Sequence, residues 1–310
     1  MLGLHKDIAQ PLLEAGADLD AGDSTGDPVL VKVADRGHLD LVGILIEAGA
    51  DVNARGPDNE VALVKAVQRG HVEIVQTLVR AGAALTTMGP QDQSTALQIA
   101  ARHGREDLVR VLIEAGADVN YRRYDRWSPL MEAAFRGRGE LASLLLSAGA
   151  DVNASHPWRG DALCIAAREG YQEIVRLLLN HLPDQLEKRK GYLAEALHTA
   201  AYFDQVLVMK LLIDAGADVD VKVRLRWAMP HQPPRSVLYE AVRKRHLLMV
   251  RLLLWARAEF DIDEVRLALA SRPFPSSPEH AEVEYRILPV LNSLQLAGRE
   301  DENNLLNELD

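Results

Sequence analysis

The stretch EAGADVN at residues 47–53 returns letter for letter at residues 114–120. Variants of it occur as EAGADLD from residue 14, RAGAALT from 80, SAGADVN from 147 and DAGADVD from 214. The first glycine of each copy falls at 16, 49, 82, 116, 149 and 216, so the steps are 33, 33, 34, 33 and 67 residues. A fixed period of about 20–50 residues indicates a repeat architecture. The step of 67 is two periods with one altered copy between them.

A single unit, residues 128–153 (SPLMEAAFRGRGELASLLLSAGADVN), divides into two short helices and a turn. Ser128 can cap the first helix, and Pro129 suits its first position because the missing amide hydrogen is not needed there. Small apolar residues line this helix, and Gly137 ends it. Leucines then recur at helical spacing, and Gly149 supplies the left-handed conformation that closes the second helix. An extended loop follows.

The segments SPLMEAA, GELASLLL and GADVN resemble the ankyrin repeat, whose pattern opens with T-P-L-H-x-A and recurs about every 33 residues. The resemblance implies an all-α ankyrin-repeat solenoid of stacked helix-turn-helix units with extended loop fingers. It also implies about seven full repeats with atypical terminal caps. The leucine of the opening tetrad recurs seven times, as Leu30, Leu63, Leu97, Leu130, Leu163, Leu197 and Leu238.

We expect an ankyrin repeat domain over residues 1–298 and an acidic tail over residues 299–310. Within the domain, residues 1–20 are an N-terminal half repeat, either a cap or the remnant of a longer array, residues 21–262 hold seven repeats, and residues 263–298 form a C-terminal cap.

Two substitutions interrupt the repeat pattern. Leu182 stands where a closing glycine is expected and is followed by a proline, which predicts an altered turn. Arg257 replaces the closing glycine of the last full repeat. It predicts a different helix ending, because a bulky side chain disfavours a positive φ.

Composition limits the classes of protein. The 310 residues carry a net charge of −10 and a single cysteine, Cys164, which excludes an internal disulfide and a cysteine metal cluster. No apolar run approaches the roughly 18 residues of a membrane span, and the N-terminus lacks the pattern of a secretory signal. We therefore expect an intracellular protein that does not bind membranes, with the cytoplasm favoured over the nucleus.

The loop fingers change charge along the chain. Those at 21–27, 54–60 and 87–94 are net negative, whereas those at 121–127, 154–160 and 221–235 are net positive, and the last is 8 residues longer than the period requires. Three of the four tryptophans, Trp127, Trp158 and Trp227, lie in the basic loops. Tryptophan, tyrosine and arginine are enriched at binding hot spots. The alternative is that each indole covers a neighbouring finger and stacks on an arginine.

The second, fifth and sixth positions after each tetrad leucine should face the concave groove that ankyrin proteins use. A positive stripe there would attract an anionic partner. The alternative is that long cationic side chains pack along their helices and only reach water. Phe135, Tyr202 and Phe203 occupy the same positions and would add an apolar floor. The stripe has a net charge of +5, from the basic residues Lys32, Arg36, Lys65, Arg69, Arg102, Arg136, Arg168, Arg243 and Lys244 and the acids Asp35, Glu132, Glu169 and Glu240.

The resemblance implies that loop tips and the exposed side of the first helices hold the partner. We expect a non-catalytic adaptor that binds an acidic or acidic-hydrophobic protein or peptide in its later repeats, with no metal and no cofactor. The predicted partner-binding residues are Arg122, Arg123, Tyr124, Arg126, Trp127, Phe135, Arg136, His156, Trp158, Arg159, Arg168, Tyr202, Phe203, Lys222, Arg224, Arg226, Trp227, His231 and Arg235.

The alternative function is an enzyme or a small-molecule binder that acts on an aromatic or anionic metabolite in the same groove. His156 and His231 lie in basic, tryptophan-bearing loops and could perform acid–base chemistry with Asp125 or Asp204. The common catalytic motifs, including H-E-x-x-H and G-x-S-x-G, are absent from the sequence. Nucleic acid is disfavoured as a partner by the net charge of −10 and by the lack of a recognised module.

Overall fold

The computed structural model describes residues 18–20, 22, 26–89, 93–183, 186–224, 233–259, 261–270 and 287–291. Contacts divide the chain into two compact units, unit 1 (Met1–Ala154) and unit 2 (Ser155–Asp310). In each unit, short helices follow one another in pairs joined by tight turns. Among the described helices, none is long and apolar enough to cross a membrane.

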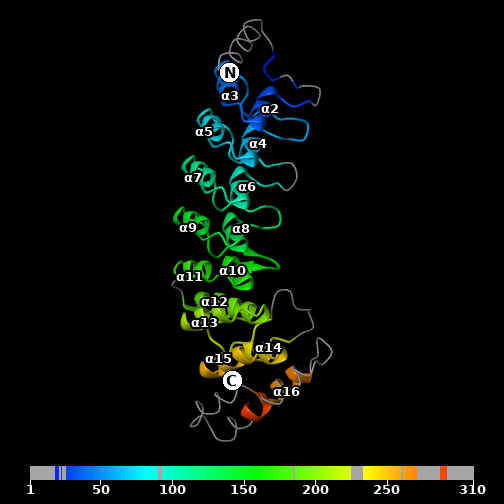
Figure 1. The fold of residues 1–310 in the computed structure, drawn as a ribbon, viewed down its shortest axis with the longest axis vertical. Helices are drawn as coiled ribbons and strands as arrows, with labels where there is room; N and C mark the ends of the chain where they lie inside the picture. Colours follow the sequence, from blue (N-terminus) through cyan, green and yellow to red (C-terminus); the bar gives the residue numbers. More distant parts are fainter. Residues whose placement is uncertain are drawn as a thin grey trace. The chain divides into compact units, whose positions relative to one another are not determined.

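Unit 1 contains four helix pairs in its described part. The pairs are α2 (Val29–Arg36) with α3 (Leu39–Glu47), α4 (Ala62–Arg69) with α5 (Val72–Arg80), α6 (Ala96–His103) with α7 (Glu106–Glu114), and α8 (Pro129–Phe135) with α9 (Gly139–Ser147). The first helices of the pairs stack on one another, and the second helices form a parallel layer beside them (Figure 1). The tetrad leucines of the first helices are buried where the two layers meet.

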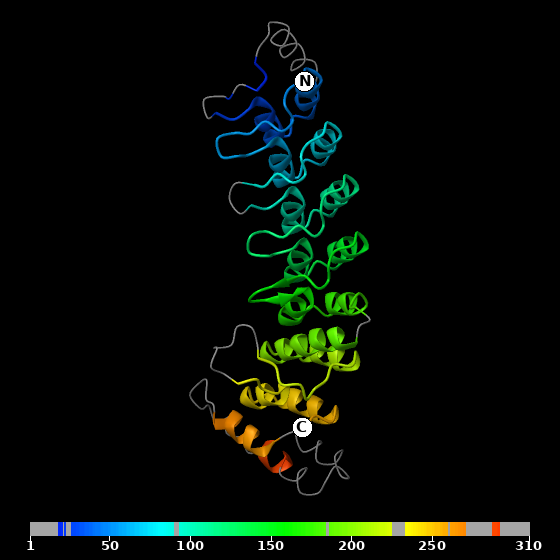
Figure 2. The same cartoon turned by 180° about the vertical axis from the view of Figure 1, so that it is seen from behind.

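Unit 2 begins with a hairpin in which β1 (Ser155–His156) pairs antiparallel with β2 (Gly160–Asp161). Three helix pairs follow in its described part: α10 (Ala162–Glu169) with α11 (Gln172–Leu179), α12 (Leu186–Tyr202) with α13 (Val206–Asp214), and α14 (Val237–Arg243) with α15 (Leu247–Trp255). The helix α16 (Ile262–Ala270) then packs on α14. The two layers of unit 2 are also visible from behind (Figure 2).

Side-chain caps start four of the described first helices, α6, α8, α10 and α14. The hydroxyl of Ser128 accepts a hydrogen bond from the amide of Met131 at 3.2 Å, and Pro129 occupies the first helical position of α8. In unit 2 a carboxylate has this role, since Asp161 accepts from the amide of Cys164 at 2.8 Å. Capping satisfies amides that the first helical turn leaves without a partner, so these four helices have a defined start.

The recurring EAGADVN stretch ends a helix and fastens its repeat to the next one. Gly49, Gly116 and Gly149 have φ values of 93°, 89° and 86°, a conformation that favours glycine. The side chain of Asn120 donates to the carbonyl of Gly149 at 3.1 Å and accepts from the amide of Asp151 at 2.7 Å. Asn53 makes the same two bonds, since its side chain donates to the carbonyl of Gly82 and accepts from the amide of Ala84.

Three helices of the last two repeats keep the left-handed closure without glycine, although Gly216 still closes α13. Arg257 has a φ of 62°, and the amides of residues 256–258 make the same three bonds as those of residues 148–150. The expectation of a different helix ending at Arg257 is therefore wrong, because the hydrogen bonds hold the arginine in the disfavoured region. Asp204 and Arg245, with φ values of 62° and 56°, replace the glycine that closes the earlier first helices.

The altered turn predicted at Leu182 is followed by a larger departure from the repeat, a lengthened first helix, that the sequence pattern did not indicate. Helix α11 ends at Leu179, and within residues 180–183 no backbone φ is positive. Helix α12 then runs for 17 residues, whereas the other described first helices have 7 or 8. The additional turns of α12 therefore stand where the preceding repeats have a loop finger.

At the C-terminal side, α16 lies at the start of the predicted cap over residues 263–298. Further along this cap only residues 287–291 are described; they are helical, and Ile287, Val290 and Leu291 are buried. Residues 1–17 of the predicted N-terminal half repeat and the acidic tail at 299–310 lie outside the described residues. The domain boundaries stay a prediction.

We predict that Arg257→Gly raises the free energy of unfolding by about 0.5–1 kcal/mol, because glycine adopts a positive φ without steric cost. The side chain of Arg257 is exposed, so its removal sacrifices little packing. Gly149→Ala is the matched reverse change and should lower stability by about 1 kcal/mol, since no heavy atom lies within 4 Å of the added Cβ and only backbone strain acts. Urea denaturation followed by circular dichroism measures both; a destabilised Arg257→Gly variant would refute the assigned strain.

We predict that Asn120→Ala lowers the free energy of unfolding by about 1–2 kcal/mol, because two hydrogen bonds between successive repeats are lost. Asn120→Asp should lose less. A carboxylate can still accept the hydrogen bond from the backbone amide, as Asp20 does from the amide of Asp51 at 3.0 Å. The control is Glu114→Ala, an exposed change six residues earlier at the end of α7. If all three variants unfold at the same urea concentration, the side chain at 120 does not connect the repeats.

Candidate binding surface

In unit 1, four of the cations predicted to face the groove, Lys32, Lys65, Arg69 and Arg136, are bound to neighbouring carboxylates, and Arg102 donates to the hydroxyl of Ser94 at 2.9 Å. Arg69 on α4 grips Asp35 on α2 through two hydrogen bonds of 2.9 and 3.2 Å. These hydrogen bonds hold the pKa of Asp35 below its usual value, although burial opposes the shift. Arg136 pairs with Glu132 one turn earlier on α8. The helix ends are therefore ion-paired to each other and to their own fingers.

The predicted stripe carries less positive charge than the helical positions alone suggested. Three carboxylates outside the counted positions neutralise lysines of the stripe, which lowers its net charge from +5 to +2. Paired charges attract a distant anion weakly, so electrostatic steering by the whole stripe is weaker than expected. The pairs are Lys32 with Asp27 at 2.7 Å, Lys65 with Glu60 at 2.5 Å and Lys244 with Asp204 at 2.8 Å.

The finger at residues 121–127 in unit 1 is tied down at its base. The buried side-chain amide of Gln98 donates to the carbonyls of Tyr121 and Trp127 at 3.2 and 3.0 Å. Asp125 binds the guanidinium of Arg123 and accepts from the amide of Trp127 at 3.0 Å. Gln98 is a positioning residue that the sequence analysis missed. It directly follows the tetrad leucine Leu97, at the histidine position of the T-P-L-H pattern.

Trp127 is not the exposed tip that the sequence suggested. Its side chain is only 8% exposed, and its indole nitrogen donates to Glu132 at 2.8 Å. Phe135 meets the indole edge-on, with ring centroids 6.0 Å apart. The hydrogen bond satisfies the polar group of a buried tryptophan, so the ring packs inward. The exposed side chains of this finger are Arg122, Tyr124 and Arg126, with Tyr124 78% exposed.

The hairpin finger of unit 2 does present an aromatic side chain to solvent. Trp158 lies in the turn between β1 and β2 and is 69% exposed. His156 braces that turn, since its Nδ1 accepts the amides of Trp158 and Arg159, both at 3.1 Å. With Nδ1 engaged by two donors, His156 is held in a fixed orientation. This structural role weakens its candidacy as an acid–base group.

Only part of the long finger in unit 2 is described. Its base is closed by reciprocal backbone bonds between Val223 and Arg235, at 3.1 and 3.2 Å. Lys222 pairs with Glu264 on α16 at 2.9 Å, and the guanidinium of Arg235 lies 4.2 Å from the ring centroid of Tyr239. Arg224 is exposed. The predicted site residues Arg226, Trp227 and His231 lie outside the described residues.

A cluster of aromatic rings and cations lies on the first helices of unit 2. Tyr202 and Phe203, at the end of α12, meet at 70° with centroids 5.1 Å apart. The guanidinium of Arg168 on α10 lies 4.5 Å from the Phe203 centroid. On α14, Arg243 and Lys244 lie 5.8 and 5.3 Å from the Tyr202 centroid. We call these five residues the basic-aromatic cluster.

All five side chains of the basic-aromatic cluster are half-buried, so the rings have both a packed side and a solvent side. Cations within about 6 Å of a ring face are attracted to its π electrons. The structure therefore brings together three predicted site residues, Arg168, Tyr202 and Phe203. It adds Arg243 and Lys244, which the sequence analysis placed in the stripe but not in the site.

Two titratable groups lie buried beneath this face. His198 on α12 is 1% exposed, and its ring nitrogens lie 2.9 Å from the carbonyls of Ala194 and Arg235. Burial lowers the pKa of His198 despite these two carbonyls. Burial likewise raises the pKa of the Cys164 thiol, with Asp161 and Glu195 adding to the effect. Cys164 therefore stays protonated and unreactive.

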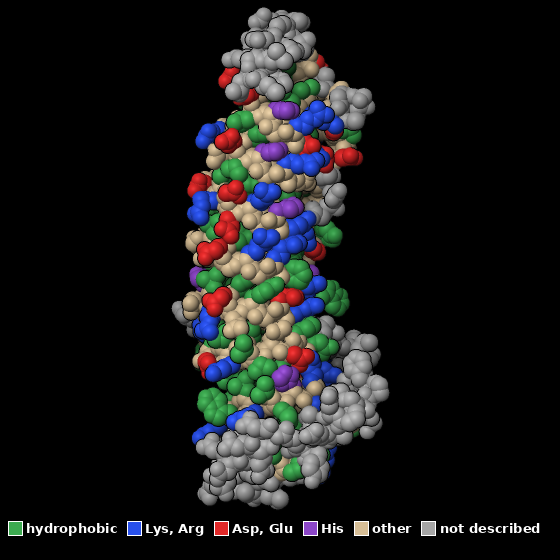
Figure 3. All heavy atoms as spheres, viewed as in Figure 1, with side chains coloured by type: hydrophobic (Ala, Val, Ile, Leu, Met, Phe, Trp, Pro, Cys, Tyr) green, Lys and Arg blue, Asp and Glu red, His purple; other side chains and the backbone are tan. Residues whose placement is uncertain are grey.

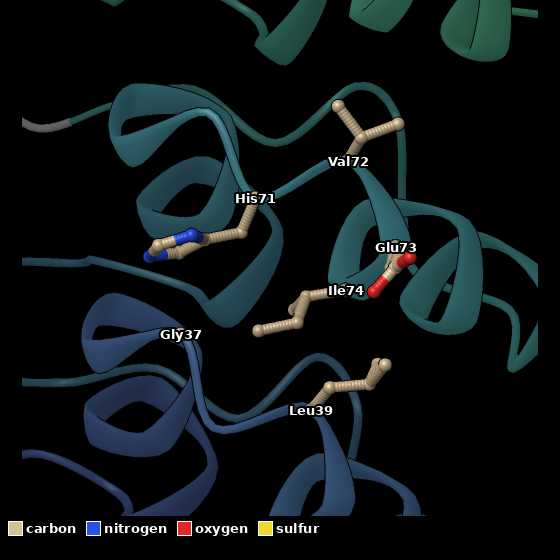
Figure 4. Close-up of a pocket in the computed structure, with 6 residues that line it drawn as sticks. All are labelled: Gly37, Leu39, His71, Val72, Glu73 and Ile74. Carbon is tan, nitrogen blue, oxygen red and sulfur yellow. The ribbon is translucent and has the colours of Figure 1, made fainter.

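A shallow hollow in unit 1 lies between two successive repeats (Figure 4). The ring of His71 extends over Gly37, and a Cβ added at Gly37 would come within 2.7 Å of that ring. Glu73 lies on the far side of Ile74 from His71 in this view. The hollow lies where two successive repeats pack closely against each other. Across the described part of the chain, no group of three or more histidine, cysteine or acidic side chains could hold a metal ion.

We predict that His198 makes the protein less stable in acid. Because the native state holds His198 neutral, the unfolded state binds a proton below the ordinary pKa of 6.5 while the folded state does not. Stability is therefore fully present above pH 6.5 and falls as the pH drops toward the lowered pKa. His198→Gln should flatten urea-measured stability between about pH 7.5 and 5 relative to the parent, and the exposed His181→Gln should not. Parallel profiles for parent and His198→Gln would exclude this linkage.

Comparison with known families agrees with the helix pairs and their spacing. The family model for ankyrin repeats (3 copies) matches the chain at residues 1–89, 85–156 and 130–223. No curated protein matches the chain. Ankyrin repeats generally mediate protein–protein interaction, and the family is generally non-catalytic. Since the matched segments together cover residues 1–223 of 310, the chain belongs to the ankyrin repeat family.

Proposed function

We propose that the chain is a non-catalytic adaptor that holds an acidic-hydrophobic peptide of another protein on the basic-aromatic cluster of unit 2. The observation that carries this proposal is the stacking of Arg168 on Phe203 at 4.5 Å, beside the half-exposed Tyr202. Helices α10, α12 and α14 each supply part of the cluster, so a ligand there would contact three successive repeats.

The rings and the cations of the cluster have separate roles in this proposal. Tyr202 and Phe203 are rigid aromatic groups, and burying such rings against a partner contributes most of the affinity at a hot spot. Arg168 and Lys244 already face the carboxylates Glu169 and Asp204, at 3.4 and 2.8 Å. A carboxylate of the ligand would exchange with these internal partners, so charge chiefly sets orientation and association rate.

Trp158 is a second contact in this proposal. It lies in the turn between β1 and β2, and β2 leads directly into α10, which carries Arg168. Tryptophan at 69% exposure presents a large apolar face that a peptide could cover. The predicted residues of the 121–127 finger, in unit 1, stay a prediction of their own.

We predict that Phe203→Ala weakens partner binding at least tenfold, equivalent to about 1.4 kcal/mol, by speeding dissociation. Arg168→Ala should chiefly slow association and reduce its salt dependence. Proteins captured from native lysate by the intact chain supply the ligands. Biolayer interferometry over a salt series then measures both rates.

The controls for this experiment come from unit 1. Asp58→Ala alters an exposed early finger, and Arg110→Ala removes an exposed arginine from a second helix. Each variant is checked by thermal melting, so that lost folding is not read as lost binding. Equal losses from the controls and the cluster variants, or unchanged binding in Phe203→Ala, would overturn the proposed site.

A further inference from the structure

The second helices of unit 2 depart from the repeat pattern at an exposed position. Ten residues after each tetrad leucine, the first five repeats carry an acid and the last two carry a leucine. Both leucines are 61% exposed. The residues at this position are Asp40, Glu73, Asp107, Glu140 and Glu173, followed by Leu207 on α13 and Leu248 on α15.

These leucines belong to a larger apolar surface. On α15, Leu248, Leu252 and Trp255 follow at spacings of four and three residues, which places them on one helical face. Trp255 is 62% exposed, and Leu252 is half-buried. On the neighbouring helix α13, Leu207 and the half-buried Leu211 repeat the first two positions, whereas the exposed Asp214 stands at the third. We call these five apolar residues the outer apolar surface.

Folding of unit 2 does not explain the outer apolar surface. The inward faces of α13 and α15 already supply the core through Val208, Met209, Leu212, Val250 and Leu253, all fully buried. Single exposed leucines are ordinary, but a contiguous group of large apolar side chains marks an interaction site. In the space-filling view, apolar side chains gather near α15, whereas charged side chains lie over α3, α5 and α7 (Figure 3).

Charge beside the surface indicates the chemistry of its partner. Thirteen residues after the tetrad leucine, all three second helices of unit 2 carry a cation: Arg176, Lys210 and Arg251. In unit 1 the same position holds one cation, Arg110, beside Gly43, Gln76 and Ser143. A second copy of the chain would bring like charges together. An acidic partner would complement them.

The spacing of the helices favours a helical partner. Packed helices lie about 8–10 Å apart, so Leu207 on α13 and Leu248 on α15 are separated by nearly that distance. Residues i and i+7 of an α-helix are separated by about 10.5 Å along its axis. A helix laid across α13 and α15 would therefore meet successive leucines with successive heptad positions.

We propose that the outer apolar surface binds one amphipathic helix of a partner protein, with leucines along one face and acidic residues along the flank. This surface lies on the second helices and is independent of the basic-aromatic cluster on the first helices. An adaptor with both surfaces would hold two different segments at once.

The test uses three labelled synthetic peptides about 18 residues long, which span about 27 Å as helices. One has a leucine face with glutamate flanks, one has lysine in place of glutamate, and one is a scrambled leucine–glutamate sequence. We expect fluorescence anisotropy to show that the full chain binds the first peptide. The lysine peptide should bind at least tenfold more weakly, and the scrambled peptide should not bind.

Variants of the full chain locate the binding. Leu207→Glu with Leu248→Glu restores the acid found in the other repeats, so folding is retained, and the glutamate peptide should bind at least tenfold more weakly. The control Leu186→Glu changes a leucine on α12 that is 62% exposed and should leave binding unchanged. Lys210→Ala should weaken binding, whereas Arg110→Ala at the same repeat position should not. Phe203→Ala should also leave binding of the glutamate peptide unchanged. This outcome distinguishes a failure of the outer apolar surface from a failure of the proposed site on the basic-aromatic cluster.

Three results would overturn the proposal. The first is equal binding of the glutamate and lysine peptides. The second is unchanged binding in the Leu207→Glu/Leu248→Glu variant. The third is concentration-dependent self-association of the parent in sedimentation velocity that this double variant abolishes, because a second copy of the chain would then cover the surface.

Discussion

The left-handed turn at the end of the second helices, present after every described second helix except α11, is the constraint on which the rest of the fold depends. It closes a helix of only about nine residues, which could not persist alone in water. Beyond the turn, Asn53 and Asn120 bond to the backbone of the next repeat through both atoms of their amides. The turn thereby fixes the distance from one helix pair to the next. The positions of the surface residues described above follow from that spacing.

The fold was predictable because its signals are local and repeated. The tetrad leucines and closing glycines locate the first and second helices without tertiary information. Specific hydrogen bonds that the repeat pattern does not encode account for the errors. Trp127 is buried because Glu132 offers an acceptor to its indole nitrogen, and Arg257 keeps a positive φ because its neighbours' hydrogen bonds require it. The seventeen residues of α12 have no counterpart in the pattern, so periodicity could not reveal them.

The candidate surfaces were predictable to different degrees. Arg168, Tyr202 and Phe203 were identified from their slots, but their mutual stacking depends on how α10 packs on α12. The neutralising carboxylates at Asp27, Glu60 and Asp204 lie outside those slots, so a count of helix positions overstates the positive charge. The outer apolar surface, by contrast, is visible in the sequence as a change from acid to leucine at one repeat position. This change can be recognised only when the repeats are compared with one another.

The non-glycine residues that close helices in left-handed conformation have a thermodynamic consequence for the array. Asp204, Arg245 and Arg257 all fall in the last two helix pairs, and each raises the free energy of its own repeat. In a linear array, stability is a sum of repeat and nearest-neighbour terms, so the weakest repeats open first as a cooperative segment. A ligand that binds only the closed form of these repeats stabilises them by mass action. The concentration of such a ligand would then set how often the C-terminal repeats unfold, and with it their exposure to proteases.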